Sequence, residues 1–350
     1  MEMVSSRKIL WHRQKVASFL AGEPVFPVTL ELGLTTVCDR SCRDCPSRLG
    51  QPGLFLSLDT ARRLFDLCRG KTFGVIISGG EPTLHPDFGL ILSSARERGF
   101  RDVVVISNGS RLDCEEVMEP LLRHASAVRV SLYDWEDGMR SEDSPTLRRI
   151  KQLRAAIEKS GSSLQIGTSL LTREASGESL SRAAAALRAA GAHWLYLHPT
   201  CISSGRGMSR LRGHQGHLLE ILEACRREQA PGFPVYFLAQ RYSTEPVVFQ
   251  GYHAAHFIMV VGADGHNYLS SETKYRARFR ITSQAEYAGA GFFATPGRRA
   301  RIAAVCSSSY PAGGSRNRGV LYNQVLENVR RQTGGGGVPV VPDFLLPHIL

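Results

Sequence analysis

The stretch TTVCDRSCRDCPSR, residues 35–48, places Cys38, Cys42 and Cys45 within eight residues in the pattern C-x3-C-x2-C. Thiolate sulfur is a soft ligand that suits zinc and iron–sulfur clusters. A structural zinc site wants four ligands, and the next Cys or His after the motif is Cys68, which falls inside a predicted helix. A [4Fe–4S] cluster held by three thiolates leaves one iron open to a substrate or cofactor. The three crowded cysteines therefore favour such a cluster.

The sequence around this motif alternates between two patterns. Short apolar runs predict strands at 27–36, 73–78, 103–107, 128–133, 164–171 and 193–199. Segments with helical character between them predict helices near 58–70, 87–99, 114–124, 147–161 and 179–191. Such alternation is typical of a parallel sheet with right-handed crossovers. We therefore expect an α/β fold, a partial (β/α)6 TIM-like barrel over residues 25–205, with its chemistry at the C-terminal ends of the strands.

Three further parts flank the predicted barrel. Residues 1–24 have helical apolar spacing and predict an N-terminal helical extension. Residues 206–333 predict a small C-terminal α+β cap, with a hairpin at 257–270 that turns at Ala263-Asp264-Gly265. Residues 334–350 begin with GGGG and predict a flexible linker and tail.

The formal net charge of +11 comes from Lys and Arg that are spread along the chain. This excess indicates a basic surface, or attraction of an anionic substrate or redox partner. We find no nucleic-acid recognition motif, so nucleic acid is not an expected partner.

The cellular compartment of the protein is predicted from features that the sequence lacks. No apolar run approaches the roughly 20 residues that span a bilayer, and the N-terminus lacks the continuous apolar region of a signal peptide. Five further cysteines are scattered, unlike a disulfide framework, and fit a reducing compartment: Cys68, Cys114, Cys201, Cys225 and Cys306. We expect a cytoplasmic protein without a membrane partner.

A second motif, SGGEP at residues 78–82, follows the second predicted strand. The C-x3-C-x2-C loop and SGGEP, in this order and on these elements, resemble the radical S-adenosylmethionine (radical SAM) superfamily. The resemblance implies that Cys38, Cys42 and Cys45 hold a [4Fe–4S] cluster whose open iron binds S-adenosylmethionine (SAM). An electron from the reduced cluster would cleave SAM to a 5′-deoxyadenosyl radical, which removes a hydrogen atom from the substrate.

The same resemblance implies contacts with SAM. Gly79 and Gly80 would let the backbone approach the methionine part of SAM, and the Glu81 carboxylate would contact its amino group. Three residues at later strand ends match the family more loosely, each with a cap or turn role as the alternative: Asn108, Ser131 and Arg173. Arg173 suits the SAM carboxylate because of its guanidinium geometry. Asp44 departs from the family, in which the residue before the third cysteine is often aromatic.

Many related enzymes hold auxiliary clusters in a C-terminal domain. Residues 257–325 resemble the outline of such a domain, but Cys306 is alone there, so we expect a cap without a cluster. Cys201 follows the sixth predicted strand and is our candidate catalytic residue, a hydrogen donor that quenches a product radical. Cys306 is the competing donor, and an inert buried thiol is the alternative for Cys201. His198 faces the same mouth, as a substrate contact or a merely hydrogen-bonded histidine.

Overall layout and size resemble radical SAM enzymes of natural-product pathways that act on sugars or nucleosides. One such group is the cytosylglucuronate decarboxylases of nucleoside-antibiotic biosynthesis. We therefore expect a small anionic sugar or nucleoside as substrate, and a flavodoxin- or ferredoxin-type electron donor. Decarboxylation, epimerisation and oxidation stay open. The alternatives are a peptide-modifying radical SAM enzyme and, from another class, a non-catalytic metal-binding protein.

Overall fold

The computed structural model describes most of the chain. The described residues are 5–42, 45, 52–136, 144–172, 176–199, 215–242, 247–287, 289–310, 317–332 and 338–350. Two of the predicted site residues, Arg173 and Cys201, lie outside them.

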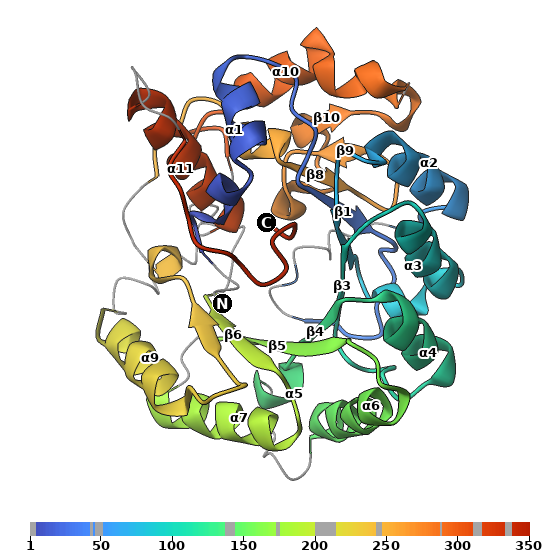
Figure 1. Ribbon diagram of the computed structural model, residues 1–350, viewed down its shortest axis with the longest axis vertical. Coiled ribbons are helices and arrows are strands. Elements are labelled where there is room, and N and C mark those ends of the chain that lie inside the picture. Colours follow the sequence, from blue (N-terminus) through green and yellow to red (C-terminus); the bar gives the residue numbers. More distant parts are fainter. Residues whose placement is uncertain are drawn as a thin grey trace.

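Six parallel strands form the centre of the molecule, in chain order and each paired with the next. They are β1 (Thr29–Gly33), β2 (Gly74–Ser78), β3 (Asp102–Ser107), β4 (Ala127–Ser131), β5 (Gln165–Leu171) and β6 (Trp194–His198). The sheet curves, and helices surround its outer face (Figure 1). The predicted partial barrel of alternating strands and helices is therefore confirmed.

The helices that follow these strands begin where capping residues place them. They are α2 (Leu58–Cys68), α3 (Phe88–Glu97), α4 (Glu115–His124), α5 (Tyr133–Glu136), α6 (Pro145–Ser160) and α7 (Gly177–Ala189). The Ser57 hydroxyl accepts a hydrogen bond from the Thr60 N–H at 3.2 Å and so caps α2, the helix predicted near 58–70. Ser144 and Ser176 cap α6 and α7 in the same way.

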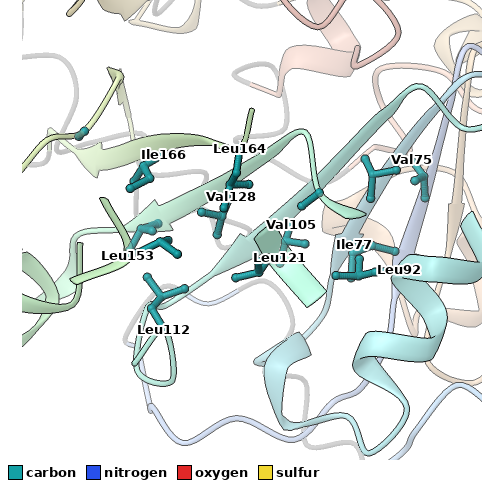
Figure 2. Packing of buried hydrophobic residues seen from close by; sticks show 14 of the residues in the cluster. Val75, Ile77, Leu92, Val105, Leu112, Leu121, Val128, Leu153, Leu164 and Ile166 are labelled. Carbon is teal, nitrogen blue, oxygen red and sulfur yellow. The ribbon is translucent and has the colours of Figure 1, made fainter. Parts of the chain in front are cut away.

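Apolar side chains fill the layer between the sheet and these helices. Successive residues of a strand point to opposite faces, so Val75 and Ile77 of β2 both point outward. They pack near Leu92 of α3, and Val128 of β4 packs near Leu153 of α6 (Figure 2). Burial of such a side chain contributes about 1.5–3 kcal/mol. The apolar core therefore lies on the outer face of the sheet, and polar residues can occupy its inner face.

The C-terminal region continues the same sheet at both edges. β7 (Val235–Phe237) pairs parallel with β6, and β8 (Ile258–Val261) pairs parallel with β1. β9 (Asn267–Tyr268) pairs antiparallel with β8, and β10 (Arg280–Thr282) pairs antiparallel with β9. The hairpin predicted at 257–270 is present, with Gly265 at φ +75° in its turn. β7 and β10 are the two edge strands of the described sheet, so the barrel is open between them.

Longer helices and single turns complete the described part. The helices are α1 (Arg13–Leu20), α9 (Gln215–Glu228), α10 (Pro296–Ala303) and α11 (Arg318–Gln332). The 3₁₀ turns are η1 (Lys8–Trp11), η2 (Pro82–Leu84), η3 (Ala239–Tyr242), η4 (His253–His256), η5 (Ser271–Thr273), η6 (Ala277–Phe279), η7 (Gln284–Glu286) and η8 (Ala290–Ala294). No helix in these ranges is both long and apolar enough to cross a membrane.

The end of the chain fills the amino-terminal end of the barrel, and Figure 1 places the C-terminus at its centre. Ile349 packs on Ile76, Val104 and Ala127, which point inward from β2, β3 and β4. The Leu350 N–H donates to the Thr29 hydroxyl at 2.9 Å. This end of the barrel is closed, so a bound molecule has its space at the C-terminal ends of the strands.

We expect the protein to lose stability on acidification because two partly buried histidines resist protonation. The pKa of His12 and that of His256 are each lowered to about 3, mainly by burial. Below the ordinary histidine pKa, near 6.5, the unfolded chain takes up protons that the folded chain refuses. The free energy of unfolding should then fall by up to about 1.4 kcal/mol per pH unit for each histidine.

Urea unfolding at pH 7, 6 and 5 checks this expectation. His12→Asn and His256→Asn should each flatten the pH dependence by about one proton. Equal slopes in both variants and the parent would show that neither histidine is responsible.

Candidate active site

A cavity of about 600 Å³ opens at the C-terminal ends of the strands. Cys38, Cys42 and Cys45 all line it. Five other residues singled out from the sequence line the same cavity: Gly79, Gly80, Asn108, Ser131 and His198. The structure thus brings together residues that come from five different strand ends. This placement matches the position of chemistry in barrels of this kind.

The SGGEP turn is bonded to the segment that leads into the cysteines. The Gly80 N–H donates to the Thr35 carbonyl at 2.7 Å, and the Glu81 N–H donates to the Val37 carbonyl at 2.8 Å. Gly79 has φ +139°, and a Cβ on Gly80 would lie 2.2 Å from the Val37 carbonyl oxygen. Both glycines are therefore needed to seat the stem of the cysteine loop, besides lining the cavity.

Gly80→Ala should displace this stem. The added methyl group meets backbone rather than a flexible side chain, so the segment before Cys38 must shift. We expect a loss of about 1–3 kcal/mol in unfolding free energy, together with weaker iron retention. Denaturant unfolding and iron analysis measure the two effects. Gly99→Ala is the matched control, since nothing lies within 4 Å of its Cβ position and only its φ of +87° opposes the change. Equal iron retention in both variants would contradict the role given to Gly80.

Glu81 is fully buried and accepts four hydrogen bonds inside the protein. The donors are the Thr83 N–H (3.1 Å), the Thr83 hydroxyl (2.7 Å), the Ser107 hydroxyl (2.9 Å) and the Asn108 N–H (2.7 Å). Burial raises the pKa of its carboxyl against the effect of these donors. The carboxylate thus fixes the loop after β3. Its contact with the SAM amino group stays a prediction.

Asn108 connects Glu81 to the cysteine loop. Its side-chain amide donates to the Asp39 carboxylate at 2.6 Å and lies 3.8 Å from the Cys38 sulfur. A chain of contacts therefore runs from Glu81 through Asn108 to Asp39 and Cys38. Asn108 was expected at SAM, and the structure gives it a second role in holding the loop.

The cysteine thiols line the cavity but do not form a complete metal site by themselves. Burial raises the pKa of the Cys38 thiol, and the Asp39 carboxylate adds to the effect. Within the described ranges, no three His, Cys, Asp or Glu side chains converge as ligands. Metal binding usually completes such a site and releases the thiol protons. Three soft sulfur donors on one cavity wall fit an iron–sulfur cluster.

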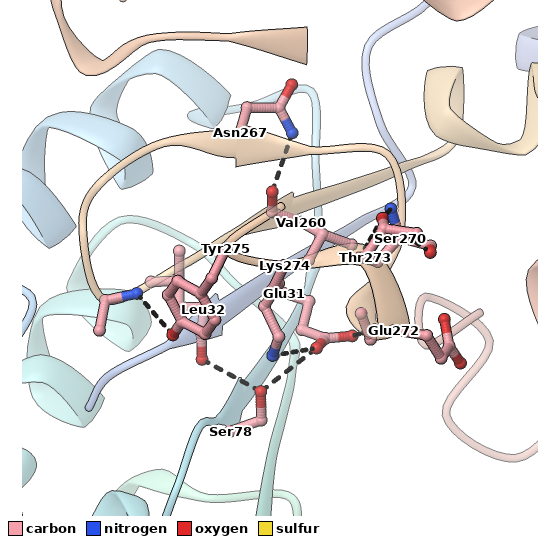
Figure 3. Close-up of polar contacts among 12 residues, drawn as sticks. Glu31, Leu32, Ser78, Val260, Asn267, Ser270, Glu272, Thr273, Lys274 and Tyr275 are labelled. Carbon is pink, nitrogen blue, oxygen red and sulfur yellow. Dashed lines mark hydrogen bonds and ion pairs between the residues drawn. The ribbon is translucent and has the colours of Figure 1, made fainter. Parts of the chain in front are cut away.

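A buried ion pair ties the C-terminal region to this cavity (Figure 3). The Lys274 ammonium lies 3.3 Å from a carboxylate oxygen of Glu31, which points inward from β1. Ser271 and Ser78 donate to the same carboxylate at 2.6 and 3.3 Å. Burial alone would raise the pKa of Glu31, but Lys274 and these donors hold it below its ordinary range. Glu31 is therefore compensated and brings no free negative charge to the cavity.

Cationic side chains line the β4–β7 side of the cavity. They are Arg129 of β4, Arg241 of η3 and Arg318 at the start of α11. Arg241 donates to the Tyr196 hydroxyl at 2.7 Å, and the Tyr196 ring stacks on His198 at 5.1 Å. Burial first, and then these three arginines, hold the pKa of His198 well below its ordinary value. His198 is therefore neutral near pH 7.

The domain around this cavity can be compared with known proteins. Residues 32–159 match the family described as the Radical SAM superfamily. This part of the chain is a radical SAM domain. GTP 3′,8-cyclase of Vibrio cholerae is 37% identical over 91 residues, which are 24% of this chain and 27% of that protein. GTP 3′,8-cyclase of Cronobacter sakazakii is 35% identical over 111 residues, 29% of this chain and 33% of that protein. The chain thus spans about a third or less of these relatives.

Solved structures share the fold of the radical SAM domain. SuiB of Streptococcus suis bound to the precursor peptide SuiA has a TM-score of 0.60 at 15% identity, over 81% of this chain and 69% of that chain. The protein anSMEcpe with bound AdoMet has a TM-score of 0.55 at 12% identity, over 87% of this chain and 99% of that chain. At these identities the likeness concerns the fold alone.

Sequence reasoning missed the charged side chains of the barrel interior. Glu31 and Arg129 sit at single positions inside apolar strands, ELGL and VRVS. A charged residue there is a signal, because an inward charge on a buried strand is costly unless something binds it. Lys274 and Arg318 carry no such local signal, since neither lies on a strand.

Proposed function

We propose that this chain is a radical SAM enzyme that acts on a small, polar, anionic substrate, with sugars and nucleosides as the leading classes. The observation that carries the proposal is one cavity lined by all three cysteines of the C-x3-C-x2-C loop and by the SGGEP glycines. Cys38, Cys42 and Cys45 would hold a [4Fe–4S] cluster, and Gly79 and Gly80 would border SAM. When bound, the cluster and SAM supply an electron and a carbon radical that abstracts hydrogen.

The residues of the chain prepare this chemistry in separate ways. The bonded stem at Thr35–Val37 presents the thiols at the mouth of the cavity. Asn108, fixed by Glu81, holds the residue after the first cysteine. Ile349, packed on the inward-pointing residues of β2, β3 and β4, keeps the opposite end of the barrel closed. Ser131 borders the cavity and stays our candidate for a contact with SAM. Arg173, our candidate for the SAM carboxylate, and Cys201, our candidate hydrogen donor, lie outside the described residues.

Two observations favour a small anionic molecule over a peptide. A cavity of about 600 Å³ lies in the size range of small-molecule sites, roughly 300–1,000 Å³. Arg129, Arg241 and Arg318 make one wall cationic, while Glu31 is already paired with Lys274. Peptide modification is the runner-up, since SuiB, which has this fold, was solved with a precursor peptide.

The test is a deuterium-transfer assay. The anaerobically reconstituted protein is reduced with SAM and offered perdeuterated uronic acids, neutral sugars, nucleosides and short peptides. Deuterium in 5′-deoxyadenosine from an anionic sugar or nucleoside supports the proposal, and label from peptides alone supports the runner-up. Zinc in place of iron and no SAM cleavage would support a non-catalytic metal-binding protein. We place the activity in the cytoplasm, with a flavodoxin or ferredoxin as electron donor.

A further inference from the structure

Arg129 is a guanidinium in the barrel interior for which the described residues supply no hydrogen-bond or ion-pair partner. It lies in the middle of β4 and points into the cavity from the inner face of the sheet. Its Nε is inaccessible to solvent and has no hydrogen-bond partner. No carboxylate of the described residues lies within ion-pair distance of it. Arg129 as a whole is half-buried, and a charge partly removed from water without a partner is costly.

The surroundings of Arg129 increase this cost. Burial lowers its pKa to about 10, and the positive charges of Arg318 and Arg241 act in the same direction. Two carboxylates border this part of the cavity, but Glu31 pairs with Lys274 and Glu272 accepts from the Asn317 amide, and neither forms an ion pair with Arg129. Arg241 is engaged with Tyr196, and Arg318 with the main-chain oxygen of Leu350. The site therefore has a surplus of positive charge centred on Arg129.

We propose that Arg129, flanked by Arg241 and Arg318, binds a carboxylate group of the substrate, which makes the substrate a carboxylic acid. The inference rests on the proposed function and names the substrate class of that same site. A planar guanidinium presents two parallel N–H groups that match the two oxygens of a carboxylate.

The carboxylate of SAM is the other source of the same chemistry, and position favours the substrate. The cysteines and the two glycines project from the ends of β1 and β2. Arg129 lies on β4, two residues before the strand end at Ser131, and its cationic neighbours come from the β7 side and from α11. Arg129 therefore lies three strands away from β1, which leads into the cysteine loop, and deeper in the barrel than Ser131, and this is where we place the substrate.

Calorimetric titration of the full reconstituted chain tests the proposal with D-glucuronate, D-glucose, D-glucose 6-phosphate and SAM as probes. We expect glucuronate to bind at least 10-fold more tightly than glucose. Arg129→Gln should weaken glucuronate binding at least 10-fold and change SAM affinity less than twofold. Arg129→Lys should restore part of the affinity. The control, Arg123→Gln on the exposed end of α4, removes an arginine that pairs with Glu119 and should change nothing.

A second measurement separates binding from a structural role. Without ligand, Arg129→Met should raise the urea midpoint, because it removes an uncompensated charge from the interior. A lower midpoint would show that Arg129 supports the fold and would overturn the proposal. The proposal also fails if glucuronate binds no better than glucose, if only the phosphate binds, or if Arg129→Gln weakens SAM instead.

The cluster-free Cys38→Ala protein keeps the two hypotheses apart. The carboxylate site is built without the cysteines, so this variant should bind glucuronate with affinity within threefold of the parent while it loses SAM cleavage. If the parent holds no iron but binds glucuronate through Arg129, the radical SAM function fails and the carboxylate site stands. If SAM is cleaved but Arg129→Gln leaves glucuronate affinity unchanged, the reverse holds.

Discussion

Cys38→Ala, Cys42→Ala and Cys45→Ala should each abolish the iron–sulfur cluster and all reductive cleavage of SAM. Each change removes one of three thiolates that line the same cavity, and two thiolates do not hold a [4Fe–4S] cluster stably. The expected result is a fall from about four irons per chain to near none after anaerobic reconstitution. Iron and sulfide analysis with the visible absorbance spectrum measures the loss.

Cys114→Ala and Cys225→Ala are the controls for this series. Cys225 is buried in the apolar core, where burial raises the pKa of its thiol to about 12, so it is a poor ligand. Cys114 is half-buried at the start of α4. Both variants should keep the iron content of the parent. About eight irons in the parent would contradict a single cluster, and zinc instead of iron would remove the basis of the proposed function.

Glu81→Ala should destabilise the protein strongly even before SAM is added. The change leaves two buried N–H groups, those of Thr83 and Asn108, without their acceptor, together with two hydroxyls. An unsatisfied buried donor costs about 1–3 kcal/mol, so we expect a loss of about 3 kcal/mol or more in unfolding free energy. Urea unfolding of the cluster-free protein measures it.

The same experiment decides between two roles for Glu81. A carboxylate that only contacts SAM would leave the stability of the SAM-free protein unchanged, and that outcome would reject the structural role derived from its four hydrogen bonds. Glu81→Gln separates the roles further. It keeps one oxygen as acceptor but turns an amide toward N–H donors, so it should lose part of the stability and also loosen Asn108 from the cysteine loop.

Local patterns in the sequence determined the elements and the chemistry of the thiols. The spacing of Cys38, Cys42 and Cys45 lies within one loop, and alternation of apolar runs predicted six strands with helices between them. Ser57 as a helix cap and the turn at Gly265 were predictable because capping and turns depend on residues within about four positions. These features need no knowledge of distant contacts.

Tertiary structure alone decided which distant segments meet. β8 pairs with β1 across more than 200 residues of sequence, and Lys274 reaches Glu31 across 243. No local period encodes such a pairing, because its energy comes from desolvation and complementary charge that exist only once both segments are in place. The same reason applies to Arg129. The sequence shows an arginine inside an apolar strand, but only the fold places Arg318 and Arg241 beside it, with no carboxylate of the described residues at ion-pair distance.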